Sequence, residues 1–154
     1  MPHNPDFEDL IRCLNDAKVE YLIVGAYAVI IYTEPRYTKD IDVWVRTTPD
    51  NAEKVLNALK NFGAPIKELT VNDLCDSEMV YQIGVEPNRI DIIMSIKGAD
   101  FETAWNRKQI ADFGQQKAFL LDIEDLIRAK QAAGRPIDST DVEKLLEARK
   151  KQGC

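Results

Sequence analysis

The chain has 154 residues, of which 45% are hydrophobic and 30% are charged. This length and apolar content allow one sizeable core, and we expect a single domain over residues 1–154. The formal net charge of −6 and the pI near 4.9 exclude a protein that coats nucleic acid by bulk charge. Such binding needs a surplus of Lys and Arg facing the phosphates. A local basic patch is still compatible with these values.

The cysteine and histidine content argues against disulfide and zinc sites. Cys13, Cys75 and Cys154 form no CxxC pair, are odd in number and occur with a single histidine, His3. The N-terminus lacks the basic flank and apolar stretch of a secretory signal. The longest apolar run, residues 21–32, is too short to cross a bilayer. We therefore expect a cytoplasmic protein with no membrane partner.

The N-terminal segments predict a helix, a strand and a second helix. Asn4 is a favoured helix cap and Pro5 is tolerated at the first helical position, so the first helix should begin there. Its apolar residues recur at helical spacing: Phe7, Leu10, Ile11 and Leu14. Residues 21–24 are apolar, and the run continues through Gly25-Ala26 to residue 32 without alternation. This pattern predicts a buried strand that turns directly into a helix.

A second strand and a third helix follow a polar loop over residues 33–39. Alternation in residues 40–46 predicts a strand that directs three side chains into the core, Ile41, Val43 and Val45. The next amphipathic helix should begin at Thr48-Pro49. It should end at Gly63, a residue type common at the C-terminal cap.

The second half of the chain alternates strand and helix signals. Residues 79–85 and 89–95 predict an antiparallel hairpin with a turn at Glu86-Pro87-Asn88. Asp100 should cap a short helix through Trp105. Residues 108–120 are consistent with one or two minor strands around a glycine, and their number stays open.

Two helices are expected to close the chain, from about residue 122 to residue 149, and to pack on the rest of the domain. Asp122 should cap the first and Asp138 the second. The combined elements indicate an α/β (α+β) fold with a mixed, partly antiparallel sheet flanked by helices.

Two acidic residues alternate with apolar residues in the strand over 40–46. Asp40 and Asp42 should project from the same face. Because like charges repel at this distance and Asp is disfavoured in strands, the pair favours a bound divalent cation such as Mg²⁺ or Mn²⁺. Solvated acids on an edge strand would explain the same pattern, so the pair alone does not decide.

Asp91 is a third acid, embedded in the apolar strand over residues 89–93. A carboxylate in such surroundings costs free energy unless it is paired. It would complete a metal site if it lay beside Asp40 and Asp42. A salt bridge to a residue such as Arg89 on the same face is the alternative.

Gly25-Ala26 marks the expected strand-to-helix junction. Small residues at such a junction let backbone N–H groups and a helix N-terminus approach phosphate oxygens. A tight turn explains the glycine equally well.

In order and spacing, these motifs resemble the signature of the minimal nucleotidyltransferase superfamily, which has a polymerase-beta-like fold. Gly25-Ala26 is followed after thirteen residues by Asp40-Ile41-Asp42, and Asp91 comes on a later strand. The resemblance is closest to a stand-alone bacterial branch that includes antibiotic-modifying transferases and transferase partners of toxin–antitoxin pairs. It extends over residues 21–25, 35–42, 88–91 and 124–127. The usual Gly or Ser after the first glycine is Ala26 here, which removes a hydroxyl contact to phosphate.

The resemblance implies a metal-dependent enzyme that transfers a nucleoside monophosphate from a nucleoside triphosphate, such as ATP, to a hydroxyl acceptor. Asp40 and Asp42 would bind the metal that bridges the triphosphate. Asp91 would help to hold a second metal and orient the attacking hydroxyl, with pyrophosphate leaving. Gly25 and Ala26 would lie against the nucleotide.

Three basic residues are candidates for phosphate contacts. Arg36 and Lys39 lie in the loop that leads to Asp40, where they would reach the departing pyrophosphate or stay solvated. Lys130 falls on the apolar face of its helix, so it either meets an anion or extends past the helix end to water. The resemblance implies a nucleotide contact for Lys130.

No motif encodes the acceptor, and a small molecule, a protein or an RNA end are all compatible. A second copy of the chain or a protein partner would supply an acceptor surface that so short a chain lacks. Two other interpretations stay open: an inactive transferase-fold binding module or antitoxin-like partner, and a plain α/β domain in which Asp91 lies far from Asp40 and Asp42.

Overall fold

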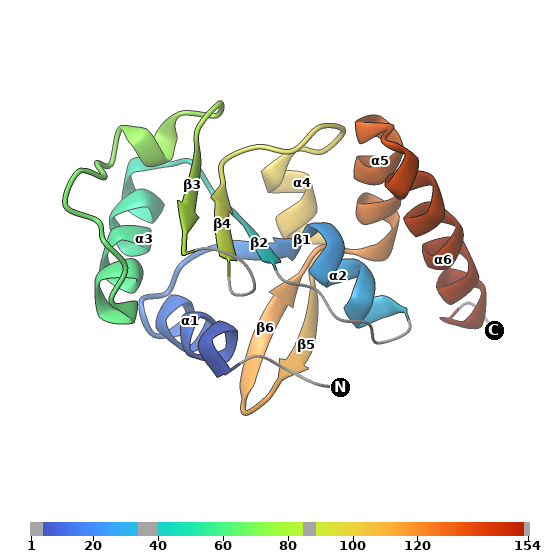
Figure 1. The fold of residues 1–154 in the computed structure, drawn as a ribbon, viewed down its shortest axis with the longest axis horizontal. Helices are drawn as coiled ribbons and strands as arrows, with labels where there is room; N and C mark the ends of the chain where they lie inside the picture. The colour runs from blue at the N-terminus through green and yellow to red at the C-terminus, as the bar shows by residue number, and fades with distance from the viewer. Residues whose placement is uncertain (1–4, 34–39, 85–88, 153–154) are drawn as a thin grey trace.

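The computed structural model describes residues 5–33, 40–84 and 89–152, and in these ranges it forms one mixed sheet with helices around it (Figure 1). The strands are β1 (Tyr21–Val24), β2 (Asp40–Val45), β3 (Val80–Ile83), β4 (Arg89–Ile93), β5 (Gln109–Phe113) and β6 (Gln116–Leu120). The helices are α1 (Pro5–Asp16), α2 (Gly25–Tyr32), α3 (Pro49–Phe62), α4 (Phe101–Asn106), α5 (Ile123–Ala133) and α6 (Pro136–Gln152), with a short 3₁₀ turn η1 (Asp73–Cys75).

The six-stranded sheet has the order β3-β4-β2-β1-β6-β5. β1 pairs antiparallel with β2, and β2 pairs parallel with β4. The two outer pairs, β3–β4 and β5–β6, are antiparallel hairpins. The predicted mixed sheet is therefore confirmed, and residues 108–120, where one or two minor strands were expected, form two. The turn expected at residues 86–88 lies outside the described residues.

Burial follows the predicted patterns. The inward residues of β2, Ile41, Val43 and Val45, are fully buried, as are the four apolar residues of the α1 stripe. α3 begins after Thr48, whose hydroxyl accepts a hydrogen bond from the Asn51 N–H, and ends at Gly63 in the left-handed region. Asp100 and Asp122 cap α4 and α5 as expected.

One helix start was predicted wrongly. α6 begins at Pro136, two residues before Asp138, because proline is well suited to the first helical position. Asp138 lies in the first turn instead and accepts a hydrogen bond from the Arg135 N–H. The cap expected at Asn4 lies outside the described residues. Among the residues that are described, no helix is long and apolar enough to span a membrane.

Different helices form the two ends of the molecule. In Figure 1, α5 and α6 lie side by side at the opposite end from α3. α2 lies between these ends, directly after β1. The β1–α2 junction, β2 and β4 each contribute residues to a cavity that α5 also lines, and the candidate site is found there.

Candidate active site

The three predicted acids come from the two central parallel strands. In the β2–β4 register Asp42 is opposite Asp91, and Asp40 is opposite Arg89. Because residues two apart on a strand share a face, all four side chains lie on one side of the sheet. The interpretation that placed Asp91 far from the other two acids is thereby wrong.

Gly25 lies against Asp42 where β1 turns into α2. Its φ is +68°, in the left-handed region that glycine tolerates, and a Cβ added there would lie 2.2 Å from Asp42 Oδ2. The neighbouring register pair, Val24 with Asp42, explains the close approach. Only glycine leaves room for the Asp42 carboxylate in this position.

Asp42 has a perturbed proton affinity. Its pKa is raised to about 6, mainly because the carboxyl is buried; the charge of Asp91, a hydrogen bond with Asp91 and the charge of Asp40 also raise it, while Lys130 lowers it. Two carboxyls that share a hydrogen bond hold a proton more firmly than either alone. A cation bound between them would relieve the same repulsion.

Arg89 contacts the other two acids. Its Nη2 lies 2.9 Å from Asp40 Oδ2, and its Nε lies 3.2 Å from Asp91 Oδ1. Nη2 also donates a hydrogen bond of 3.2 Å to Asp91 Oδ2. The salt bridge that was the alternative interpretation of Asp91 therefore exists, beside the contact with Asp42.

Within residues 5–33, 40–84 and 89–152, no three His, Cys, Asp or Glu side chains are gathered as a group ready to hold a metal ion. Asp42 and Asp91 are adjacent, whereas Asp40 is paired with the guanidinium of Arg89. The buried Asp91 Oδ1 accepts no hydrogen bond from the described residues. Metal binding by these three acids stays a prediction.

A cavity of about 300 Å³ opens beside Asp42 and is mostly apolar. Gly25 and Asp42 form one wall, and three cationic side chains contribute to the others. Its lining consists of Val24, Gly25, Asp42, Ile93, Ile96, Lys97, Leu121, Leu126, Ala129, Lys130, Ala133 and Arg135. The cavity is therefore bounded by β1, β2, the segment after β4, and α5.

Lys130 faces inward, as its position on the apolar face of α5 predicted. It is only 6% exposed, and its Nζ lies 3.2 Å from Asp138 Oδ1 and 3.2 Å from Asp141 Oδ2. The alternative in which it extends to water is therefore wrong. The anions that it meets are supplied by α6, and a nucleotide contact stays a prediction.

The remaining predicted residues are placed less directly. Ala26 is half-buried in the first turn of α2, directly after Gly25. Arg36 and Lys39 lie outside the described residues. Lys97 lines the cavity but carried no sequence signal of its own. The glycine that follows it, Gly98, was the one sign that the backbone here packs closely against another element. Gly98 has φ +81°, and a Cβ there would lie 2.9 Å from Ala132 Cβ on α5.

Comparison with protein-family models decides the affiliation. The model for a nucleotidyltransferase of unknown function (DUF6036) matches residues 7–148. The chain belongs to this nucleotidyltransferase family. The search of curated proteins found no match.

Solved structures share the nucleotidyltransferase fold. The lincosamide antibiotic adenylyltransferase LnuA, in a lincomycin-bound crystal structure, has a TM-score of 0.62 and 15% identity, covering 96% of this chain and 99% of LnuA. The antibiotic-resistance factor ANT(2'')-Ia has a TM-score of 0.60 and 12% identity, with coverage of 96% and 82%. An antigenic nucleotidyltransferase-like protein from Paracoccidioides brasiliensis has a TM-score of 0.53 and 17% identity, with coverage of 96% and 78%. At these identities the similarity shows the fold alone.

Proposed function

We propose that the chain is an active, metal-dependent nucleotidyltransferase that moves a nucleoside monophosphate from a nucleoside triphosphate to a hydroxyl acceptor and releases pyrophosphate. The observation that carries the proposal is the Asp42–Asp91 pair held against Gly25 at the wall of a cavity. Family membership supports the reaction class. The carboxylate pair supports the chemistry.

The acids fit a hard divalent cation, Mg²⁺ or Mn²⁺. Asp42 and Asp91 are adjacent carboxylates, and burial together with the charge of Asp91 raises the pKa of Asp42 to about 6. Asp40 would join them after exchanging its contact with Arg89. When bound, the metal would neutralise charge on the triphosphate and on the leaving pyrophosphate.

The chain's own residues would position the nucleotide. Gly25 allows a close approach to the first turn of α2, which carries no side-chain cap and so leaves N–H groups for phosphate oxygens. Lys97 brings positive charge to the cavity, and Lys130 and Arg135 also line it, although both are paired with acids of α6. Its apolar remainder would hold the nucleoside, while Asp91 would orient the acceptor hydroxyl.

The acceptor is left unassigned between a small molecule, a protein and an RNA end, in an antibiotic-modification or toxin–antitoxin setting. LnuA is described as an antibiotic adenylyltransferase and was solved with lincomycin. That similarity favours testing small molecules first. A second copy or a partner protein would complete the acceptor surface, and a monomer with full activity would overturn this part of the proposal.

Label transfer from α-labelled triphosphates to small-molecule, protein and RNA pools tests the activity. Asp42→Asn should lower the transfer rate by about 100-fold or more, because it removes a carboxylate that would hold the metal beside the reacting phosphates. Asp112→Asn is the matched control, since Asp112 is an exposed acid on β5 paired with Lys117. Undiminished transfer by Asp42→Asn would remove this residue from the mechanism.

A catalytically inactive binding module, such as an antitoxin-like partner, is the second candidate. Ala26 in place of Gly or Ser, and the Arg89 ion pairs with two of the acids, favour it. Thermal unfolding with Mg²⁺ and a triphosphate separates the candidates, because a ligand of the native state raises its stability. A raised melting temperature together with label transfer supports the enzyme, and neither effect supports the module.

A further inference from the structure

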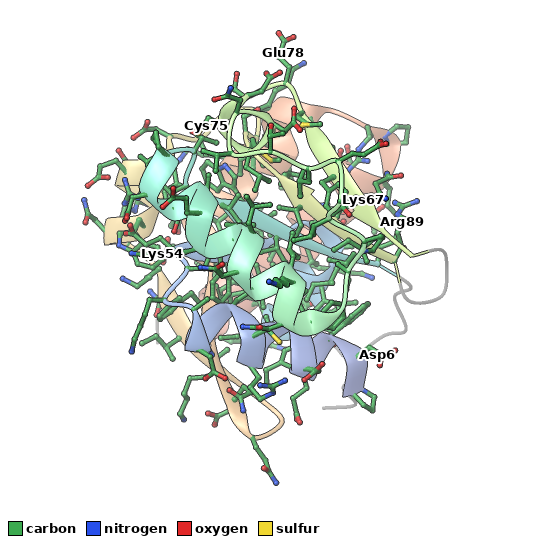
Figure 2. All side chains as sticks on the ribbon, turned by 90° about the vertical axis from the view of Figure 1, so that its left-hand side faces the viewer. Asp6, Lys54, Lys67, Cys75, Glu78 and Arg89 are labelled. Carbon is green, nitrogen blue, oxygen red and sulfur yellow. The ribbon has the colours of Figure 1, made fainter. Side chains whose placement is uncertain are left out.

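Arg89 lies in the middle of the acidic cluster, where the proposed function needs a metal. It is the first residue of β4, and Figure 2 labels its side chain at that end of the sheet. Its guanidinium bridges Asp40 on β2 and Asp91 on β4, which are separate segments of the chain. A planar guanidinium suits this bridging role because it presents several donors in a fixed arrangement.

The Arg89 bridge changes the net charge of the acidic cluster. Three carboxylates and one guanidinium leave a net charge of −2 when all four are ionised, which is the charge that one divalent cation neutralises. Without Arg89, the cluster would carry −3 within a few ångströms. Arg89 therefore holds Asp40 and Asp91 in place by occupying oxygens that a metal would also use.

We propose that Arg89 is a positioning residue that acts as an internal counter-ion: it holds Asp40 and Asp91 together before metal binds and competes with the metal for them. This inference rests on the proposed function. Metal entry requires the guanidinium to leave at least one carboxylate, and the side chain, about one-third exposed, has room to turn outward. Arg89 thus raises the concentration of metal ion that is needed to occupy the site.

Mn²⁺ binding measured by electron paramagnetic resonance, without substrate, tests the competition. Arg89→Gln should bind Mn²⁺ roughly tenfold more tightly than the wild type, because a positive charge a few ångströms from the cation is removed. Arg89→Lys should fall between the two, since a single ammonium grips two carboxylates less well than a guanidinium. Arg12→Gln is the control, because within the described part of the chain it removes an arginine whose ion pairs are with Asp9 and Asp16, two exposed acids on α1.

A second readout uses stability alone. Without metal, Arg89→Gln should melt at a lower temperature than the wild type, because Asp40 and Asp91 lose their ion pairs with the guanidinium. Added Mg²⁺ should raise its melting temperature more than that of the wild type or of Arg12→Gln. If Arg89→Gln does not fold, Arg89→Lys carries both measurements.

The outcomes separate the inference from the proposed function. Unchanged or weaker Mn²⁺ binding by the Arg89 variants, with clear binding and label transfer by the wild type, overturns the inference and leaves the proposed function standing. No Mn²⁺ binding by any variant, even with a triphosphate present, overturns the metal-dependent function and the inference with it. Tighter binding by Arg89→Gln together with its larger Mg²⁺ stabilisation supports the inference.

Discussion

At the scale of single residues, the site depends on one glycine that leaves space for one carboxylate. A side chain at Gly25 would meet two separate obstacles, a backbone in the left-handed region and the Asp42 carboxylate 2.2 Å from the new Cβ. Gly63 meets only the first, since its φ is +93° and nothing lies within 4 Å of a Cβ there. Substitutions at the two glycines therefore distinguish the effect of backbone strain from the effect of displacing the Asp42 carboxylate.

Gly63→Ala should lower the free energy of unfolding by about 1–2 kcal/mol, because it forces alanine into the left-handed region, and Gly25→Ala should lower it by more, because its Cβ must also displace the Asp42 carboxylate. Only Gly25→Ala should also lose stabilisation by Mg²⁺ and triphosphate, since Asp42 must turn away. Urea unfolding with and without ligand measures both effects. Retained ligand stabilisation in Gly25→Ala would show that the orientation of Asp42 is not needed for binding.

The raised pKa of Asp42 predicts a pH dependence of stability. Its pKa is about 6 in the folded chain against 3.8 for an ordinary Asp, so the folded state binds the proton more tightly. This contribution is fully present below pH 4 and is lost as the pH rises through 6. At neutral pH, Asp42→Asn should therefore be more stable than the wild type by on the order of 2 kcal/mol.

Denaturant unfolding of both proteins from pH 4 to pH 8 measures this difference. The advantage of Asp42→Asn should shrink as the pH falls through 6 and be largely lost near pH 4, where the folded carboxyl is protonated and the unfolded one begins to be. A stability difference that is constant over this range would contradict the raised pKa.

At the scale of elements, the buried ion cluster joins α5 to α6. Lys130 on α5 contacts Asp138 and Asp141 on α6, and both acids are 1% exposed. Hydrogen bonds from Arg135 are the main reason that the pKa of Asp138 falls to about 2, so its carboxylate is charged at neutral pH. The helix pair therefore rests on buried charges as well as on apolar packing.

Lys130→Met should lower the free energy of unfolding by about 3–5 kcal/mol, because two buried carboxylates lose their ion pairs with the Lys130 ammonium. The double variant Lys130→Met/Asp141→Asn should lose less than the sum of the single variants, with a coupling of about 0.5–3 kcal/mol. Unfolding in guanidinium chloride measures the free energies for this double-mutant cycle. Strict additivity, or an unchanged stability in Lys130→Met, would contradict the structural role.

The sequence predicted the elements better than their contacts. Hydrophobic periodicity and capping residues located α1, α3 and α5, because these signals are local. The partner of Lys130 depends on how α6 crosses α5, which no local pattern encodes. At the start of α6 two local signals competed. The preference of proline for the first helical position outweighed the expected cap, so the helix begins ahead of Asp138.

The candidate site was predictable to a similar degree. Alternation placed Asp40 and Asp42 on one face, and the resemblance to known transferases brought in Asp91. The register that sets Asp42 opposite Asp91, and Asp40 opposite Arg89, depends on strand pairing and became visible only in the fold. Lys97 was missed because its place beside the cavity follows from the packing of Gly98 against α5.

At the scale of the whole molecule, the sheet ends in two edge strands, β3 and β5, that carry exposed apolar side chains. Val80 on β3 is 51% exposed and Ile110 on β5 is 62% exposed. Edge strands offer unpaired backbone groups to other chains, and an apolar side chain there strengthens such pairing. Self-association at high concentration should therefore involve these edges.

Ile110→Lys should reduce concentration-dependent association and change the free energy of unfolding by no more than about 0.5 kcal/mol, because the residue is exposed. Ile137→Lys is the control, since Ile137 is 53% exposed but lies on α6, away from the sheet edges. Light scattering over a range of concentrations measures the effect. An equal reduction in both variants would point to general surface hydrophobicity rather than to the edge strand.

The candidate site is assembled from parts that are far apart along the chain. Gly25 comes early, Asp42 and Asp91 follow on parallel strands that α3 and β3 separate along the chain, and Lys130 comes near the end. Contacts between such distant segments form late, because a long loop must close first. A nascent chain therefore cannot assemble the cavity before α5, which forms one of its walls, has been translated.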